Sequence, residues 1–232
     1  MQVENISNSY PVTSTLSESH QEIIIPVEHF ELSKDLSIQF KIKRLIDIVA
    51  SAGVLVFFTP IWILMGILIK VDSEGPVFYK QRRIGRHGKP FAMYKFRTMF
   101  NNAEKQTGPV WAKRDDARVT KMGGFLRKFG IDEIPNLINV LLGDMSLIGP
   151  RPERPYFVNQ FRHKINNYTS RLELKPGISG LAQIYYKYDE SIEDVKKKLE
   201  YDLTYIENFS LWLDIKIVFL TFYIILAGKS KF

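Results

Sequence analysis

One stretch of this chain is too apolar for an ordinary soluble domain. It runs from Leu45 to Ile69, "LIDIVASAGVLVFFTPIWILMGILI", and its 25 residues include a single charge, Asp47. Crossing a bilayer takes roughly 20 apolar residues, so the stretch is long enough to enter one. The alternative is a core helix buried inside the protein, but a chain of 232 residues has little core to surround such a helix. The pattern predicts a membrane-embedded segment.

The flanks and one proline suggest how the segment enters the membrane. Basic residues lie on both sides of it: Lys41, Lys43 and Arg44 before, and Lys70, Lys80, Arg82, Arg83 and Arg86 after. Short basic flanks mark the cytoplasmic side of a membrane helix. Thr59-Pro60 lies inside the run, where proline removes a backbone hydrogen bond and the Thr59 hydroxyl is placed to compensate. We expect a helix that breaks at Pro60 and returns to the same face; a kinked crossing is the alternative.

The charge distribution is uneven. Residues 1–40 carry a net charge of −5, whereas residues 70–128 contain 15 Lys and Arg against 5 acids. Such a basic block attracts phosphates of nucleic acids, lipid headgroups or small substrates, although a solvated basic face is the simpler explanation. The chain has no cysteine, which excludes disulfides and thiolate chemistry. No cleavable signal peptide is visible at its start.

The remaining sequence suggests short elements. We expect residues 1 to about 32 to form a poorly ordered arm or a docking strand around "EIIIPV", and Ser33 to cap the next helix. The glycine-punctuated stretch after residue 72 favours a hairpin. Helices are expected before Gly130, before Gly143 and over "ESIEDVKKKLEYDLTYIENFS", whose apolar residues at helical spacing form one face: Ile192, Val195, Leu199, Leu203 and Ile206. The apolar tail from Leu211 is expected to lie in the membrane interface.

Two adjacent carboxylates, Asp132 and Glu133, precede Pro135. Because proline is tolerated in the first helical turn, a helix is expected to begin near Asp132, with the pair as its cap. Arg127 and Arg151, the latter in a Gly-Pro-Arg-Pro turn, support a second interpretation. A carboxylate among cations can act as a nucleophile or a Mg²⁺ ligand, and the cations can hold a phosphate.

Two further clusters contain residues that could bind phosphate. Lys95 and Arg97 in "YKFRTM" are two apart and would share a face of a strand. In "KPGISGLAQI" the glycines offer backbone amides and Gln183 offers a side-chain amide. Taken alone, the first cluster is an exposed basic edge and the second is a loop. Neither a Walker phosphate loop nor a dinucleotide fingerprint is present.

Several separated motifs resemble the bacterial sugar transferase family, the monotopic phosphoglycosyltransferases that begin glycan assembly on a polyprenyl phosphate carrier. They are "KRLIDIVAS", "TPIWILMGILIKVDSEGPVFYKQRRIGRHGKPFAMYKFRTM", "LRKFGIDEIPNLINVLLGDMSLIGPRP" and "LKPGISGLAQI", in family order and spacing. The resemblance runs from Lys41 to the C-terminus and leaves residues 1–40 unexplained. The family breaks its re-entrant helix at Ser-Pro, where this chain has Thr59-Pro60.

The resemblance implies a reaction and roles for individual residues. A sugar-1-phosphate would pass from a nucleotide-diphosphate sugar to polyprenyl phosphate through a phosphosugar intermediate on Asp132, releasing a nucleoside monophosphate. Glu133 would assist, and Mg²⁺ would bind at Asp132. Lys95, Arg97, Arg127, Arg151 and Gln183 are the expected phosphate- and substrate-binding residues. A non-catalytic membrane-surface scaffold is the rival hypothesis, and nucleic-acid binding is disfavoured by the apolar run.

Together, the patterns and the resemblance predict an α+β fold, mainly α. We expect a polar arm over 1–40, a re-entrant membrane helix-break-helix over 41–70, and a single compact catalytic domain over 71–232 with interfacial amphipathic helices. The expected location is the cytoplasmic face of a bacterial inner membrane. The expected partners are a nucleotide-diphosphate sugar, polyprenyl phosphate and membrane lipid, with a homodimer left open.

Overall fold

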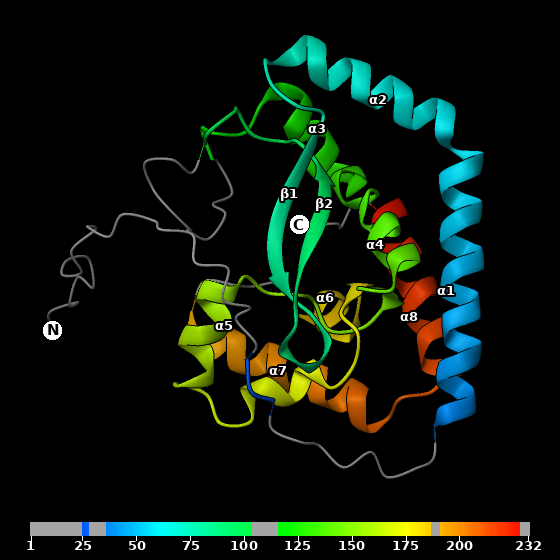
Figure 1. Ribbon diagram of the computed structural model, residues 1–232, viewed down its shortest axis with the longest axis vertical. Helices are drawn as coiled ribbons and strands as arrows, with labels where there is room; N and C mark the ends of the chain where they lie inside the picture. The colour runs from blue at the N-terminus through cyan, green and yellow to red at the C-terminus, as the bar shows by residue number, and fades with distance from the viewer. Residues whose placement is uncertain (1–24, 28–35, 104–115, 187–190, 228–232) are drawn as a thin grey trace, which may run out of the picture.

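Two long helices meet at a bend of 64° along one edge of the molecule (Figure 1). In this computed structural model, which describes residues 25–27, 36–103, 116–186 and 191–227, α1 spans Ser37–Phe57 and α2 spans Thr59–Asp72. Pro60 lies in the first turn of α2, where its missing N–H costs nothing. The helix breaks where the sequence predicted a break, and the Thr59 hydroxyl donates to the Leu55 carbonyl at 2.7 Å.

Within the described residues, no single helix is long and apolar enough to cross a bilayer, whereas the bent pair qualifies by length and composition. The first helix begins at Ser37, and Ser33, its expected cap, lies outside the described residues.

Polar residues attach α1 to the rest of the protein. Its two buried residues are Asp47 and Ser51. The Asp47 carboxylate accepts the Leu147 N–H at 3.1 Å, and the Arg44 guanidinium donates to the Val140 and Leu141 carbonyls near the end of helix α4 (Asn136–Leu142). Most of its large apolar side chains, including Leu45 and Val49, point outward and are exposed. A helix on the surface of a protein in water would bury its apolar side chains and expose its polar ones.

A hairpin forms the centre of the structure, as predicted. Strands β1 (Phe78–Ile84) and β2 (Pro90–Phe96) are antiparallel, with Tyr79 paired to Lys95. The 3₁₀ turn η1 (Arg86–Gly88) joins them, with His87 and Gly88 both at positive φ. A second, parallel pair consists of β3 (Ser146–Ile148) and β4 (Gly177–Ser179).

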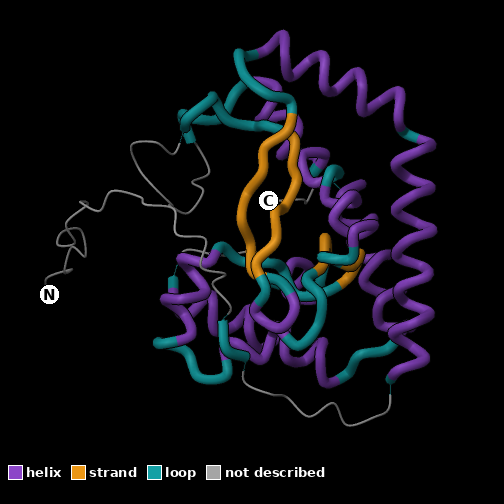
Figure 2. Tube along the Cα trace, viewed as in Figure 1, coloured by secondary structure: helices purple, strands orange, loops and turns teal. Residues whose placement is uncertain are grey.

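Helices make up most of the remaining structure (Figure 2). They are α3 (Lys121–Phe129), η2 (Ile131–Glu133), α4 (Asn136–Leu142), α5 (Pro155–Arg162), η3 (Tyr168–Leu172), α6 (Leu181–Tyr185), α7 (Ile192–Glu207) and α8 (Leu211–Leu226). The predicted mainly helical α+β fold is confirmed. The predicted ends at Gly130 and Gly143 are also correct, because both glycines adopt the left-handed conformation that ends a helix.

The largest core cluster lies between α5, η3 and α7. The predicted apolar face of α7 supplies Val195 and Leu199, which pack with Phe161 and Tyr168. Ile25, from the predicted apolar island, is buried in the same cluster, and residues 25–27 form no strand. The predicted tail helix forms as α8, and its buried residues are Asp214 and Ile217.

Two adjacent glycines in α3 allow a direct test of its packing. A Cβ at Gly123 would overlap the backbone of Thr98, whereas a Cβ at Gly124 would meet nothing within 4 Å. Overpacking costs about 1–3 kcal/mol, and 1 kcal/mol shifts Tm by about 2–4 °C at this size, so we expect Gly123→Ala to lower Tm by roughly 3–10 °C. Gly124→Ala should raise Tm slightly, because alanine stabilises a helix by up to about 1 kcal/mol relative to glycine. Thermal unfolding in detergent measures both, and equal shifts would contradict this packing.

Candidate active site

Glu133 lies at the centre of a buried ion cluster. Its Oε1 accepts hydrogen bonds from Lys95 Nζ and from Arg151 Nη2, each at 2.6 Å, and its Oε2 accepts from Arg151 Nη1 at 3.2 Å. Only 6% of Glu133 is exposed. One carboxylate thus binds two cations from segments that are far apart in the sequence, and the cluster keeps a net positive charge.

The acid pair does not cap a helix, contrary to the sequence-based expectation. Asp132 and Glu133 lie in η2, directly after the left-handed Gly130, and neither side chain makes a capping hydrogen bond for this turn. The α-helix that follows begins only at Asn136, with Pro135 as the residue before it. The chain enters the helix through a 3₁₀ turn, and the Glu133 carboxylate bonds to Lys95 and Arg151 and not to its own backbone.

Lys95 is positioned by the attachment of α4 to β2. The Asn139 side chain donates to the Ala92 carbonyl at 2.7 Å and accepts the Tyr94 N–H at 3.0 Å. These two hydrogen bonds attach α4 to the edge of β2. They fix Lys95, the residue after Tyr94, opposite Glu133. The sequence analysis did not single out Asn139, because an asparagine within a helix carries no distinctive signal.

Arg151 is fixed by three hydrogen bonds to its own backbone segment. The Ile84 N–H donates to the Glu153 carbonyl at 2.9 Å, and the Arg83 guanidinium donates to the Pro152 carbonyl at 2.9 Å. The buried Arg171 guanidinium donates to the Arg151 carbonyl at 2.8 Å. The chain is therefore held at the last two residues of the Pro-Arg-Pro turn and at the residue that follows it.

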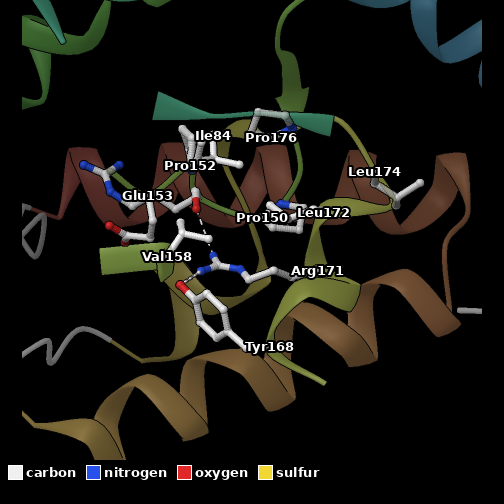
Figure 3. A pocket seen from close by; sticks show the side chains of 11 residues that line it. Ile84, Pro150, Pro152, Glu153, Val158, Tyr168, Arg171, Leu172, Leu174 and Pro176 are labelled. Atoms are coloured by element: carbon white, nitrogen blue, oxygen red, sulfur yellow. Dashed lines mark hydrogen bonds between the residues drawn. The ribbon is translucent and has the colours of Figure 1, made fainter. Parts of the chain in front are cut away.

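Figure 3 shows the support behind this turn. A small cavity behind the turn is lined mostly by prolines and other apolar side chains. The Arg171 side chain reaches across this cavity and donates to the Tyr168 hydroxyl at 3.0 Å. Asp202 on α7 pairs with the same guanidinium at 2.7 Å. This small cavity is part of the scaffold of Arg151 and leaves no space for a substrate. Sequence reasoning missed Arg171 and Asp202, which lie outside the acid and glycine motifs.

Asp132 is buried beside this cluster but is not bonded into it. Its Oδ1 has no hydrogen-bond partner among the described residues, and 7% of the residue is exposed. Burial, followed by the adjacent charge of Glu133, raises the pKa of Asp132, although nearby cations oppose the shift. Burial alone would also raise the pKa of Glu133, but Arg151 and Lys95 outweigh it and lower that pKa below its usual range. Glu133 is therefore the acid held ionised by cations, and Asp132 is the acid whose ionisation is disfavoured by burial.

Of the other predicted site residues, Arg127 lies near Asp132, whereas the side chains of Arg97 and Gln183 bond to backbone carbonyls. Arg127 donates to the Thr98 hydroxyl at 2.9 Å and is close enough to Asp132 for each charge to affect the pKa of the other. Arg97 instead binds the carbonyls of Ile69, Ser73 and Glu74 at the end of α2, so its guanidinium is occupied away from the cluster. Gln183 donates to the Ile178 carbonyl at 3.2 Å beside β4.

The site offers few protein ligands for a divalent cation. No group of three or more His, Cys, Asp or Glu among the described residues could hold a metal. Magnesium, however, is commonly bound by one or two carboxylates together with substrate phosphates. The buried, unpartnered Oδ1 of Asp132 is such a carboxylate oxygen. If Mg²⁺ binds here together with substrate phosphates, Asp132 is the protein carboxylate that could contact it.

This arrangement suits chemistry at phosphorus. A carboxylate oxygen without a partner can attack an electrophile, and Lys95, Arg127 and Arg151 supply positive charge for a phosphate that approaches it. Glu133 accepts hydrogen bonds from Lys95 and Arg151, whereas the Oδ1 of Asp132 has no partner among the described residues. The two acids thus have different environments.

Comparison with known proteins agrees with the family resemblance of the sequence motifs. The family model described as "Bacterial sugar transferase" matches residues 38–228. A protein of Aeromonas hydrophila, "UDP-N-acetylgalactosamine-undecaprenyl-phosphate N-acetylgalactosaminephosphotransferase", is 48% identical over 187 residues, which are 81% of this chain and 44% of that protein. The "UDP-glucose:undecaprenyl-phosphate glucose-1-phosphate transferase" of Klebsiella pneumoniae is 42% identical over 82% of this chain and 41% of its own length.

A protein of the same name from Escherichia coli strain K12 is 38% identical over 94% of this chain and 47% of its own length. The chain thus spans less than half the length of these three relatives.

The central role of Glu133 in the cluster can be tested by stability. Glu133→Gln leaves the Lys95 and Arg151 charges without their shared anion, so we expect a loss of about 3 kcal/mol at neutral pH. Glu153→Gln is the control; its bond to Arg83 is longer, at 3.3 Å, and we expect a loss of no more than about 1 kcal/mol. Denaturant unfolding in detergent measures both.

The pH dependence of this loss has a definite sign. Because folding lowers the pKa of Glu133, its contribution is complete above the unfolded value of about 4.3 and is lost as the pH falls further. The difference between wild type and Glu133→Gln should therefore shrink in acid. A difference that is small at neutral pH, or grows in acid, would contradict this role.

Proposed function

Because this chain belongs to the bacterial sugar transferase family, we propose that it transfers a sugar-1-phosphate from a UDP-sugar to polyprenyl phosphate, such as undecaprenyl phosphate. The single observation that supports this most is the buried, unpartnered Asp132 Oδ1 beside three cations. The relatives are named for this class of reaction, and the different environments of the two acids suit it. The proposed reaction is the first membrane step in assembly of a glycan such as exopolysaccharide, capsule, O-antigen or a protein-linked glycan.

The proposed chemistry has two displacements at one phosphorus. Asp132 Oδ1 attacks the sugar-bearing phosphorus; a bond from Asp132 to phosphorus forms, and the bond to the bridging oxygen breaks, releasing UMP. An oxygen of polyprenyl phosphate then attacks the same phosphorus. The bond to Asp132 breaks, which restores its carboxylate and yields polyprenyl-diphosphate-sugar.

The residues around Asp132 have distinct parts in this scheme. Glu133 remains ionised and keeps Lys95 and Arg151 in place, so that their positive charge acts on an incoming phosphate. Arg127 adds positive charge near Asp132. Mg²⁺ bound at Asp132 would supply further charge neutralisation for the diphosphate. Asp132 reacts in its ionised form. Its raised pKa is consistent with a carboxyl group that no salt bridge occupies and that is therefore available to react.

The proposed location is the cytoplasmic face of a bacterial inner membrane, with α1 and α2 as a re-entrant pair. Their bend, the polar inner side of α1 and its exposed apolar side chains support this placement. Exposed aromatic residues on α8, such as Trp212 and Phe219, would lie at the headgroup level. In this orientation the polyprenyl phosphate comes from the bilayer and the nucleotide sugar from the cytosol.

Asp132→Asn tests the nucleophile. Purified wild type with polyprenyl phosphate, Mg²⁺ and a panel of UDP-sugars should release UMP, and the variant should lose at least about 10³-fold in rate because an amide cannot form the intermediate. Arg97→Lys is the control, since its contacts lie at the end of α2. Wild type that binds membranes but never releases UMP would favour the scaffold hypothesis. Full activity in Asp132→Asn would exclude Asp132 as the nucleophile.

The absence of cysteine makes the topology directly testable. Lys41 and Glu74 are exposed residues near the outer ends of the bent pair. We expect a membrane-impermeant thiol reagent added outside intact cells to label neither Lys41→Cys nor Glu74→Cys, and to label both after permeabilisation. Labelling of one position alone in intact cells would establish a crossing helix.

A further inference from the structure

Asn136 is a buried side chain to which the scheme above assigns no role. It is 0% exposed, and neither its Nδ2 nor its Oδ1 has a hydrogen-bond partner among the described residues. Buried polar atoms are nearly always hydrogen-bonded in folded proteins, so a carboxamide with both ends unpaired needs an explanation. Its position suggests one.

Asn136 faces the ion cluster. Ile134 and Pro135 have right-handed helical angles, so the chain turns continuously from η2 into α4. Residues three apart on such a turn share a face, and here these are Glu133, Asn136 and Asn139. Glu133 contacts Lys95 of β2 and Asn139 contacts Ala92 and Tyr94 of β2. Asn136 therefore faces β2 between these two contacts.

Asn139 provides an internal comparison. It is equally buried, on the same face and one turn further along, yet both ends of its carboxamide are bonded to β2. The fold can thus satisfy an asparagine on this face when its role is structural. Asn136, by contrast, has no hydrogen-bond partner among the described residues. It lies one helical turn after Asp132, the reactive carboxylate, whose Oδ1 also has no partner.

The charge of the site indicates which kind of ligand would use this carboxamide. Lys95, Arg127 and Arg151 outnumber Asp132 and Glu133, so the region favours an anion over a cation. A neutral amide adds a donor for an anionic oxygen without further buried charge. The same approach that brings an anion to Asp132 Oδ1 brings it within one helical turn of Asn136.

We propose that Asn136 binds the transferred phosphoryl group, with its Nδ2 donating to a phosphoryl oxygen while Asp132 attacks the phosphorus. This rests on the proposed function and adds a substrate-binding residue to it. A preorganised neutral donor in a buried site stabilises charge as it develops on the phosphoryl oxygens. The role explains both the burial and the missing protein partners of Asn136.

Three variants test the proposal: Asn136→Leu, which removes the hydrogen-bonding groups at similar volume; Asn136→Asp, which replaces the donor with an anion; and Asn139→Leu, the structural control. The first reaction step is followed without polyprenyl phosphate, as UMP release and as the mass gained by the protein, with UDP-N-acetylgalactosamine and UDP-glucose. Tm in detergent is measured for each variant, with and without the UDP-sugar.

We expect Asn136→Leu to slow the first step by about 10²-fold, as loss of one such donor typically does, and Asn136→Asp to slow it more. Without substrate, Asn136→Leu should keep a Tm equal to or above that of wild type, because no protein hydrogen bond is lost. Asn139→Leu should lower Tm clearly. The UDP-sugar should raise the Tm of wild type more than that of Asn136→Leu.

Three results would overturn the proposal while leaving the function intact. They are a wild-type rate in Asn136→Leu, an Asn136→Asp variant faster than Asn136→Leu, and a loss of Tm in Asn136→Leu as large as in Asn139→Leu. The second would show that the acceptor oxygen is the functional atom. If wild type itself gains no mass and releases no UMP with any UDP-sugar, the proposed function fails, and the role of Asn136 fails with it.

Discussion

The bonds from Glu133 to Lys95 and Arg151 join three parts of the chain: the end of β2, the 3₁₀ turn after α3, and the Pro-Arg-Pro turn after β3. Breaking a buried pair of this kind typically costs about 3–5 kcal/mol, because the remaining charge stays buried without compensation. The surrounding structure therefore has to hold all three parts in register. Asn139 does this for β2, and Arg83 and Arg171 do it for the turn.

The same arrangement gives two neighbouring carboxylates different properties. Glu133 is surrounded by donors and its pKa falls, whereas Asp132 gains burial and a neighbouring negative charge and its pKa rises. A one-residue step along a 3₁₀ turn rotates a side chain by about a third of a circle, which is enough to move it from the cations to an unpartnered position. The difference between the two acids thus comes from the turn itself and not from their residue types.

Much of the architecture was predictable because it depends on local signals. Pro60, Gly130 and Gly143 end or break helices through backbone constraints that act within a few residues, and each was located correctly. The glycine turns after Asp72 indicated short strands or a hairpin, and the spacing of apolar residues in α7 indicated its buried face. The helix start was misplaced at Asp132, because a proline allows either an α-helical first turn or a 3₁₀ entry and the sequence does not distinguish them.

By itself, the sequence determined the apolar segment with its break, the helix ends and the types of residue present at the site, because periodicity, proline and charge act locally. Only the tertiary structure decided how they are used. It placed Arg97 at the end of α2 and Lys95 at the acid pair, although they are two residues apart, and it left Asp132 and Asn136 unpaired while Glu133 and Asn139 are bonded. The physical reason is that hydrogen bonds and burial depend on what packs opposite a side chain, and these partners come from distant parts of the chain.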